Sequence, residues 1–292
     1  MKWQPVCDPR FKLAEGPFWD DIQQSLYWVD IARFRALRLY QGQLYQWQFH
    51  EPVSAFIPTV HGDALVTLAS GVYRLNLDSL AEYPDVSLLC VADPVEGNRA
   101  NEARCDSAGR LWLGTMQNNL DAEGGDLPLE RRSGGIFRVD ADARVTPLLE
   151  HQGIVNTLLW ADDNSTLLSA DSLDGIIWRY PILTDGSLGE RGIWAGPHER
   201  GVPDGSAMDA QGYVWNCRWG GHCIIRFSPG GTVDRIVELP LSHPTSCAFG
   251  GPEMTTLFVT SARPDSHAME LDGAVLQLET GIRGLASQPF AG

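Results

Sequence analysis

The sequence predicts an all-β fold, a six-bladed β-propeller with four-stranded blades, and three observations lead to this prediction. A short module recurs six times, in which a turn containing Asp, Asn or Gly precedes a β-prone pair and then small or polar residues. The copies lie about 40–55 residues apart, a period typical of propeller blades. Glycine and proline, with 30 and 18 residues, punctuate the whole chain, and no long apolar stretch has helical spacing.

Each module is centred on one strongly β-prone position. These positions are Tyr27, Leu65, Leu111, Leu167, Val214 and Leu257. Further strand candidates follow five of the modules, at 71–77, 134–140, 175–182, 223–229 and 273–279. Six modules predict six blades in a single domain over residues 1–292. The alternative is a large β-sandwich, whose turns recur about every 8–12 residues without requiring the longer period.

Composition and charge narrow the possible partners. The hydrophobic fraction of 43% and the charged fraction of 20% are those of a soluble globular protein. The net charge of −15 opposes binding to nucleic acid and to anionic membranes. The first residues lack the apolar stretch of about 7–15 residues found in signal peptides, and no run approaches the roughly 18 apolar residues of a membrane span. We therefore expect a cytoplasmic protein without nucleic-acid or membrane partners.

Residue types that often carry chemistry show no catalytic pattern. The six cysteines are scattered without a CxxC pair, so we expect reduced thiols that lie mostly in the core. The seven histidines occupy loop-like contexts and no G-x-S-x-G motif occurs, which argues against a nucleophilic triad. The tryptophans that accompany the modules are expected in the core, and these are Trp19, Trp112, Trp160 and Trp215.

Polar segments precede four of the modules, at 13–20, 98–106, 153–163 and 201–212. Because the innermost strand of each blade lines the axis, polar residues at equivalent ends of different blades converge. Glu15, Asn156 and Asp204 stand in AEGP, IVNT and VPDG, and a buried carboxylate needs a partner such as a cation. Their oxygen donors suit Ca²⁺, Mg²⁺ or Mn²⁺. EGP and PDG are also turn sequences, so spacing alone leaves both interpretations open.

These segments, in this order, resemble the gluconolactonase, senescence-marker protein or regucalcin family. The shared motifs are AEGPFW, an R-x-N element followed by D-x-x-G-R-L-W-x-G-T-M, Asp171–Ser172, the PDG stretch ending in G-Y-x-W, and CxFGG with TSAR. They extend from Glu15 to Arg263. The resemblance implies a six-bladed propeller with one divalent metal on its axis, which hydrolyses the internal ester of an aldonolactone.

The resemblance also implies roles for individual residues. Glu15, Asn156 and Asp204 match the metal ligands, and Arg99 and Asn101 match the substrate contacts. Ca²⁺ is favoured by the resemblance and by oxygen ligation, with Zn²⁺, Mn²⁺, Mg²⁺ and Fe²⁺ as alternatives. Asp204 is our choice of general base toward the attacking water, because a carboxylate beside a cation can also accept a proton.

The chain departs from the family pattern at three places. Thr157 stands where the family usually has Gly, and Glu102–Ala103 replaces Asp-Gly, which predicts a longer and more acidic pocket wall near Asn101. A Glu that some members carry after GTM has no clear counterpart. The loop 117–126 offers four candidates, of which Asn119 is preferred for substrate binding: Asn118, Asn119, Asp121 and Glu123.

The expected activity is hydrolysis of a pentose or hexose aldono-1,4- or 1,5-lactone to the aldonic acid. Alternatives on the same fold are a phosphotriesterase or a lactonase for less polar lactones, a non-catalytic calcium-binding regulator, and a protein-interaction propeller. The expected partner is therefore a small sugar lactone, and the protein is expected to be a monomer or a weak homodimer. The sequence leaves open which sugar is used.

Overall fold

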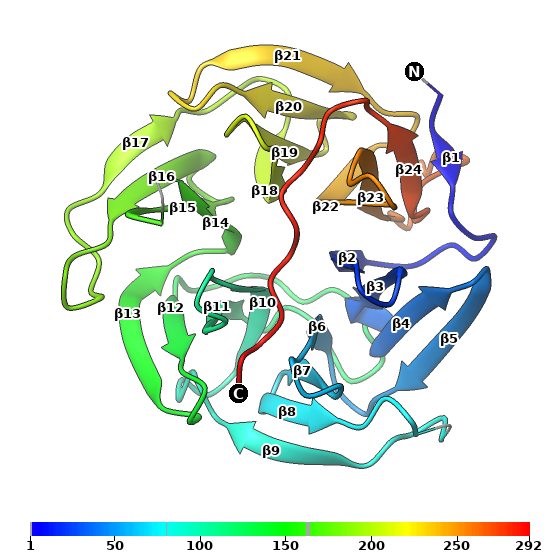
Figure 1. Cartoon of the computed structure of the whole chain (residues 1–292), viewed down its shortest axis with the longest axis vertical. Coiled ribbons are helices and arrows are strands. Elements are labelled where there is room, and N and C mark those ends of the chain that lie inside the picture. The colour runs from blue at the N-terminus through cyan, green and yellow to red at the C-terminus, as the bar shows by residue number, and fades with distance from the viewer. Residues whose placement is uncertain (1, 80, 162–163) are drawn as a thin grey trace.

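The computed structural model describes residues 2–79, 81–161 and 164–292, and it confirms the six-bladed propeller with four-stranded antiparallel blades (Figure 1). Blades 1 to 5 are β2–β5, β6–β9, β10–β13, β14–β17 and β18–β21, and blade 6 combines β22–β24 with β1. Residues 162 and 163, which end the predicted polar segment 153–163, lie outside the described residues.

The strands fall into four concentric groups. The innermost strands are β2 (Ala14–Asp20), β6 (Val53–Pro58), β10 (Asn98–Cys105), β14 (Val155–Ala161), β18 (Val202–Met208) and β22 (His243–Gly250). The second strands are β3 (Ser25–Asp30), β7 (Ala64–Leu68), β11 (Leu111–Gln117), β15 (Thr166–Asp171), β19 (Val214–Trp219) and β23 (Thr256–Ala262). The third strands are β4 (Arg35–Tyr40), β8 (Gly71–Leu75), β12 (Gly134–Val139), β16 (Ile176–Pro181), β20 (Cys223–Phe227) and β24 (Leu276–Glu279). The outermost strands are β5 (Gln43–Gln48), β9 (Val86–Cys90), β13 (Val145–Gln152), β17 (Gly192–Ala195), β21 (Val233–Glu238) and β1 (Gln4–Pro5).

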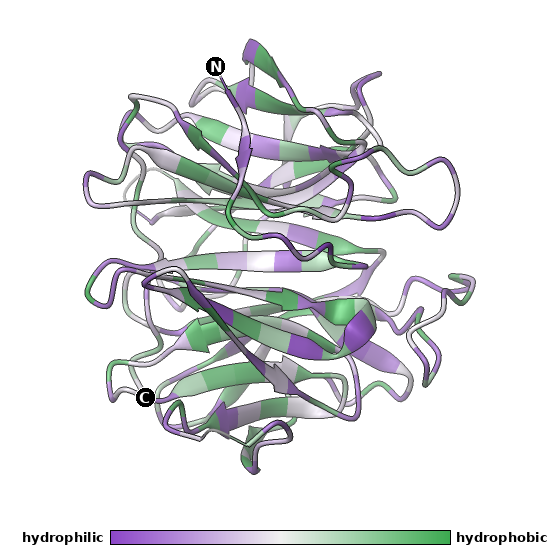
Figure 2. Ribbon diagram, turned by 90° about the vertical axis from the view of Figure 1, so that its right-hand side faces the viewer, coloured by the Kyte–Doolittle hydropathy of each residue, from purple (hydrophilic) through white to green (hydrophobic). Residues whose placement is uncertain are grey.

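All six sequence modules form second strands, and the five additional strand candidates form third strands. A short 3₁₀ helix, Ile31–Arg33, joins β3 to β4. Hydrophobic and hydrophilic residues alternate in short stretches along many strands (Figure 2). The described residues contain no helix long and apolar enough to cross a membrane.

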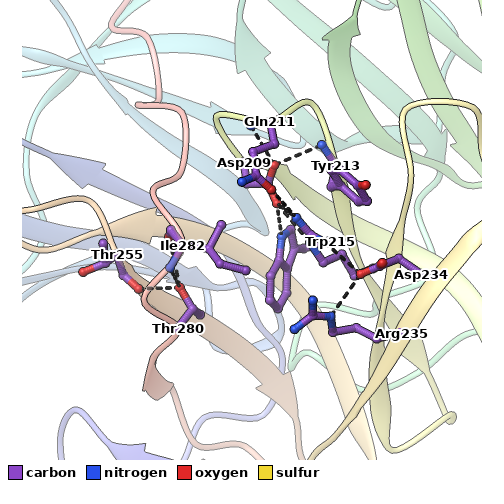
Figure 3. Close-up of polar contacts among 10 residues, drawn as sticks. Asp209, Gln211, Tyr213, Trp215, Asp234, Arg235, Thr255, Thr280 and Ile282 are labelled. Carbon is purple, nitrogen blue, oxygen red and sulfur yellow. Dashed lines mark hydrogen bonds and ion pairs between the residues drawn. The ribbon is translucent and has the colours of Figure 1, made fainter.

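The repeated Asp-x-x-Gly-x-x-Trp sequence has a direct structural cause. In blade 5, the buried carboxylate of Asp209 accepts hydrogen bonds from the Tyr213 amide and from Trp215 Nε1, both at 3.0 Å (Figure 3). In blade 3, Asp106 accepts a bond from Trp112 Nε1 at 2.9 Å in the same way. The Asp therefore fixes the turn between the first and second strands and also pairs the one polar atom of a buried indole.

The core lies largely between neighbouring blades. Tyr27 of blade 1 stacks on Phe56 of blade 2 at 4.8 Å between ring centroids. Trp112 of blade 3 meets Trp160 of blade 4 edge to face at 5.7 Å. As expected, Trp112 and Trp215 are fully buried, although Trp19 and Trp160 are only partly so. All six cysteines are free and four of them are buried, in agreement with reduced thiols.

Both ends of the chain tie blades together. The N-terminal strand β1 pairs with β24 and so completes blade 6, which closes the ring (Figure 1). Residues 281–292, which we call the C-terminal strap, cross the propeller on the face where the innermost strands end (Figure 1). The Leu285 amide donates to the Met208 carbonyl of blade 5 at 2.9 Å, and the Phe290 amide donates to the Pro58 carbonyl of blade 2 at 3.0 Å.

Candidate metal and substrate site

Every innermost strand carries a β-bulge in its first half, so six irregularities surround the axis at one level. The residues that interrupt the pairing are Gly16 and Pro17, Ser54, Asn101, Thr157, Asp204 and Gly205, and Thr245 and Ser246. A bulge bends its strand and redirects side chains, and bulges are common beside active sites. The ring of bulges therefore explains why predicted site residues from different blades gather here.

Hydroxyl groups at three of the bulges each join one blade to the next, and so link three pairs of neighbouring blades. Each donates to a main-chain carbonyl at or beside a predicted site residue: Ser54 Oγ to Ala100 at 2.5 Å, Thr157 Oγ1 to Asp204 at 2.5 Å, and Thr245 Oγ1 to Ala14 at 2.6 Å. The bonded carbonyls thus belong to Asp204 itself, to the residue before Glu15 and to the residue between Arg99 and Asn101. These bonds fix the backbone from which the candidate ligands project.

Thr157, which replaces the usual Gly, adopts a backbone conformation that favours glycine, with φ of 54°. A β-branched residue in this left-handed region is strained. The Thr157 hydroxyl offsets this strain, because it bonds to the Asp204 carbonyl and lies 2.8 Å from Ser206 Oγ. The departure from the family pattern therefore replaces backbone freedom with an inter-blade hydrogen bond.

Glu15 and Asp204 are buried carboxylates, exposed by 9% and 6%. Burial, together with the negative charge of Glu102, raises the pKa of Glu15 to about 8. Burial and the charges of Glu15 and Glu102 raise the pKa of Asp204 well above its usual range. Each accepts a hydrogen bond from the amide of the following glycine. No lysine or arginine among the described residues forms an ion pair with either carboxylate.

Asn156 directly precedes the bulged residue Thr157, and its side chain is 5% exposed. Its Oδ1 accepts one hydrogen bond, from Asn101 Nδ2 at 3.0 Å, and its Nδ2 donates to Ser172 Oγ at 2.9 Å. Because a carbonyl oxygen has two lone pairs, Oδ1 retains one for a cation. Two mutually repelling carboxylates and this amide oxygen form a hard donor set that fits a divalent cation.

The described residues hold no cluster of three or more His, Cys, Asp or Glu side chains arranged to bind a metal. The predicted ligand set, Glu15, Asn156 and Asp204, contains two carboxylates and one amide, and is therefore not a cluster of this kind. All seven histidines are exposed or half-buried. Five lie outside strands as expected, whereas His151 belongs to β13 and His243 begins β22.

The predicted substrate residues lie side by side. Arg99 Nη1 donates to Asn101 Oδ1 at 2.9 Å, and Arg99 Nη2 donates to Asn119 Oδ1 at 2.9 Å. Arg99 is 3% exposed, and burial lowers its pKa to about 10 while the charge of Glu15 acts in the opposite direction. The preferred loop residue Asn119 is thus connected to Arg99.

The other three loop candidates lie differently. Asn118 Nδ2 bonds to the Leu120 carbonyl, and the Asp121 carboxylate accepts the amides of Glu123 and Gly125, so both stabilise the loop itself. Glu123 is exposed. None of these three shares the contact that Asn119 makes with Arg99.

Glu102 makes the surroundings of the candidate ligands more acidic, as expected, but the cavity that it lines does not include Asn101. Its carboxylate lies 3.5 Å from Arg104 Nε and lines an axial cavity of about 300 Å³. The cavity continues along the second halves of the innermost strands, past Phe56 and Phe249, to residues 285–288 of the strap. Sequence reasoning missed that Glu102 is a third buried acid close enough to raise the pKa values of Glu15 and Asp204. Its position directly after Asn101 in the sequence was the available signal.

The chain is similar to known proteins along most of its length. Residues 13–263 match the family model described as SMP-30/Gluconolactonase/LRE-like region. The chain is 32% identical to 6-deoxy-6-sulfogluconolactonase of Pseudomonas putida, an alignment that covers 96% of this chain and 95% of that protein. It is 29% identical to regucalcin of Gallus gallus, with 100% and 99% covered.

Solved structures show the same architecture. A luciferin-regenerating enzyme superposes with a TM-score of 0.91 at 26% identity, covering 100% of this chain and 99% of that one. Regucalcin of Agrobacterium tumefaciens, described as a calcium-binding protein, superposes with a TM-score of 0.89 at 24% identity, covering 100% and 98%. At 24% identity, the likeness to this regucalcin shows the shared fold alone.

Proposed function

The chain belongs to the SMP-30/gluconolactonase/LRE-like family, and from this premise we propose that it is a metal-dependent hydrolase of sugar lactones. The observation that carries the proposal is the pair of buried carboxylates, Glu15 and Asp204, which form no ion pair with any described residue and lie with Asn156 at the ring of bulges. Arg99 retains donors beside this ring, because its Nη2 makes one hydrogen bond, to Asn119 Oδ1, and its Nε makes none among the described residues. Asn101 lies next to it and offers its Oδ1, which accepts from Arg99 Nη1.

Glu15, Asn156 and Asp204 would hold the cation, with Ca²⁺ favoured because all three donate oxygen. When bound, a divalent cation polarises the lactone carbonyl and stabilises the negative charge that develops on its oxygen. The remaining donors of Arg99 and the Oδ1 of Asn101 orient the substrate, so that its carbonyl carbon is held where water can attack.

The reaction requires a group that takes a proton from the attacking water. The oxygen of water bonds to the carbonyl carbon, the ring C–O bond breaks, and the ring oxygen leaves as a hydroxyl group. Asp204 accepts the proton of the attacking water and passes it on to the leaving oxygen. The product acid then ionises, so each turnover releases one proton at neutral pH.

The polar wall formed by Arg99, Asn101 and Asn119 favours a ligand rich in hydroxyl groups over an apolar lactone. A pentose or hexose aldonolactone has this character. The name of the Pseudomonas putida relative, a sulfogluconolactonase, supports a lactone of the hexose class. A calcium-binding regulator would have no use for a cationic side chain held beside the cation site, as Arg99 is.

The role of Asp204 is tested by Asp204→Asn, which preserves size and one oxygen donor while removing the base. We expect kcat at saturating metal to fall by about 10²–10⁴-fold, the usual contribution of a general base. Glu253→Gln, which removes an exposed acid from a distant turn, serves as the control for charge and should retain full turnover. Full turnover by Asp204→Asn with intact metal binding would assign the base to another group.

A further inference from the structure

A row of hydrogen bonds crosses blades 3, 4 and 5 with one fixed direction. It begins at Arg99, whose guanidinium group can only donate. Arg99 Nη1 bonds to one terminal atom of the Asn101 amide at 2.9 Å, so that atom must be the oxygen. The nitrogen of the same amide then faces Asn156, where the bonded atom, 3.0 Å away, must accept.

The other end of the row is fixed by an acceptor. Asn156 turns its oxygen toward Asn101, so its Nδ2 donates to Ser172 Oγ at 2.9 Å. Ser172 then has its single proton left to donate, and gives it to the Pro203 carbonyl at 2.6 Å. A carbonyl oxygen can only accept, so neither amide can flip without setting two donors against each other.

We propose that Ser172 is a positioning residue, which fixes the side-chain amide of Asn156 with its oxygen available to the cation. This inference rests on the metal site of the proposed function. Without the hydroxyl, Asn156 Nδ2 loses its acceptor among the described residues. The bond from Asn101 alone then opposes a flip of the amide, which would present NH₂ in place of oxygen. The bond to Pro203, the residue before Asp204, also holds the candidate ligands of blades 4 and 5 in one arrangement.

The contacts of Ser172 exclude a nucleophilic role. Its hydroxyl proton is directed to the Pro203 carbonyl, and its two hydrogen-bond partners in the described structure are Asn156 Nδ2 and that carbonyl. Neither partner is a base. The side chain is nearly buried, at 9% exposure, and acts through Asn156.

The test measures metal binding directly, by calorimetric titration of metal-free protein with Ca²⁺ and with Mn²⁺ in the absence of lactone. Ser172→Ala should bind both ions about 10–100-fold more weakly, the usual effect of losing a group that orients a ligand. Ser172→Thr, which keeps the hydroxyl, should recover most of the affinity.

The matched control is Ser169→Ala. Ser169 lies on the same strand, β15, but its hydroxyl bonds at 3.4 Å to the main-chain carbonyl of Asn156 and leaves the side-chain amide alone. Its loss should leave metal affinity unchanged. The melting temperature of each metal-free variant separates loss of affinity from loss of folding.

Repeating the substitution in an Asn156→Asp protein distinguishes loss of amide orientation from a general disturbance of the site. In Asn156→Asp both terminal atoms are oxygen, so there is no amide to orient. Adding Ser172→Ala to this variant should weaken metal binding far less than it does in the wild type. Wild-type affinity in a folded Ser172→Ala protein, or an equal loss in both backgrounds, would overturn the positioning role while leaving the metal site intact. A wild-type protein that binds neither ion would overturn both proposals.

Discussion

Burial disfavours the ionised form of a carboxylate, and this effect is strong at Glu15 and Asp204. Both carboxylates occupy the ring of bulges, both are close to Glu102, and the pKa of each is raised mainly by burial. A cation opposes this effect because it favours the ionised forms. If Glu15 and Asp204 hold a cation, the residues that stabilise the metal-bound protein destabilise the metal-free protein, and the effect depends on pH.

The first prediction concerns stability of the metal-free protein against pH. The folded-state pKa of Glu15 is raised from 4.5 to about 8, so the native state binds more protons than the unfolded state between these values. Stability should therefore fall as pH rises from about 4.5 to 8. Glu102 and Asp204 act in the same direction. Asp140 and Asp234, with lowered pKa values, act below this window, and His243, whose pKa is lowered by burial, opposes the trend within it.

Thermal unfolding of metal-free protein at several pH values between 5 and 8 gives the measurement. Glu15→Gln should flatten the dependence, and saturating Ca²⁺ should do the same in the wild type. A melting temperature that rises across this window in the metal-free wild type would contradict the assignment of Glu15 as a buried carboxylate with a raised pKa.

At the scale of elements, the inter-blade hydroxyl bonds connect turn chemistry to packing. Thr157→Val and Thr245→Val keep the side-chain shape but leave the carbonyls of Asp204 and Ala14 without that donor. Each should lower the free energy of unfolding by about 1–3 kcal/mol, the usual effect of removing one partner of a buried hydrogen bond. Thr146→Val on the outer strand β13 is the control, and an equal effect there would refute the argument.

The strap offers a separate element to test. Phe290 is fully buried and bonds through its amide to blade 2. Phe290→Ala removes a buried aromatic ring and should lower stability by up to about 3–5 kcal/mol. Limited proteolysis should then cut within residues 281–292 more readily, while metal affinity at the opposite end of the axis stays near the wild-type value. Unchanged proteolysis would show that Phe290 does not hold the strap.

The sequence predicted second and third strands well because their determinants are local. Turn residues such as Asp106 and Asp209 form hydrogen bonds to residues only a few positions further along the chain. The strands that follow are either buried or alternate between apolar and polar residues. Outermost strands were not predicted, because strands such as β21 are almost wholly exposed and show no inward pattern. The pairing of β1 with β24 joins the two ends of the chain, which no local pattern encodes.

Across the whole molecule, residues far apart in the chain meet because each blade presents its first strand to the axis. Sequence motifs therefore located Glu15, Asn156, Asp204, Arg99 and Asn101 on the innermost strands, where the structure places all five. Which amide faces which hydroxyl depends on packing between blades, so the link from Asn156 through Ser172 could not be predicted. The position of Glu102 at the end of the axial cavity is likewise a product of tertiary structure.

The ring also separates two regions of the axis. The candidate ligands lie near the starts of the innermost strands, whereas the strap and the axial cavity lie toward their ends. The candidate ligands therefore lie toward one face of the propeller, and the strap crosses the other. The central claim, that the cation and the donors around it open a sugar lactone, concerns the first face.

The most direct test of that claim is proton release near neutral pH from freshly prepared pentono- and hexonolactones. The assay compares metal-free protein with protein given Ca²⁺, Zn²⁺, Mn²⁺ or Mg²⁺. The account predicts release well above the spontaneous rate with at least one sugar lactone, abolished by removing the metal and restored by adding it back. If protein that binds the metal releases protons only at the spontaneous rate with every lactone and ion, the lactonase function is contradicted. The calcium-binding regulator would then be the remaining interpretation.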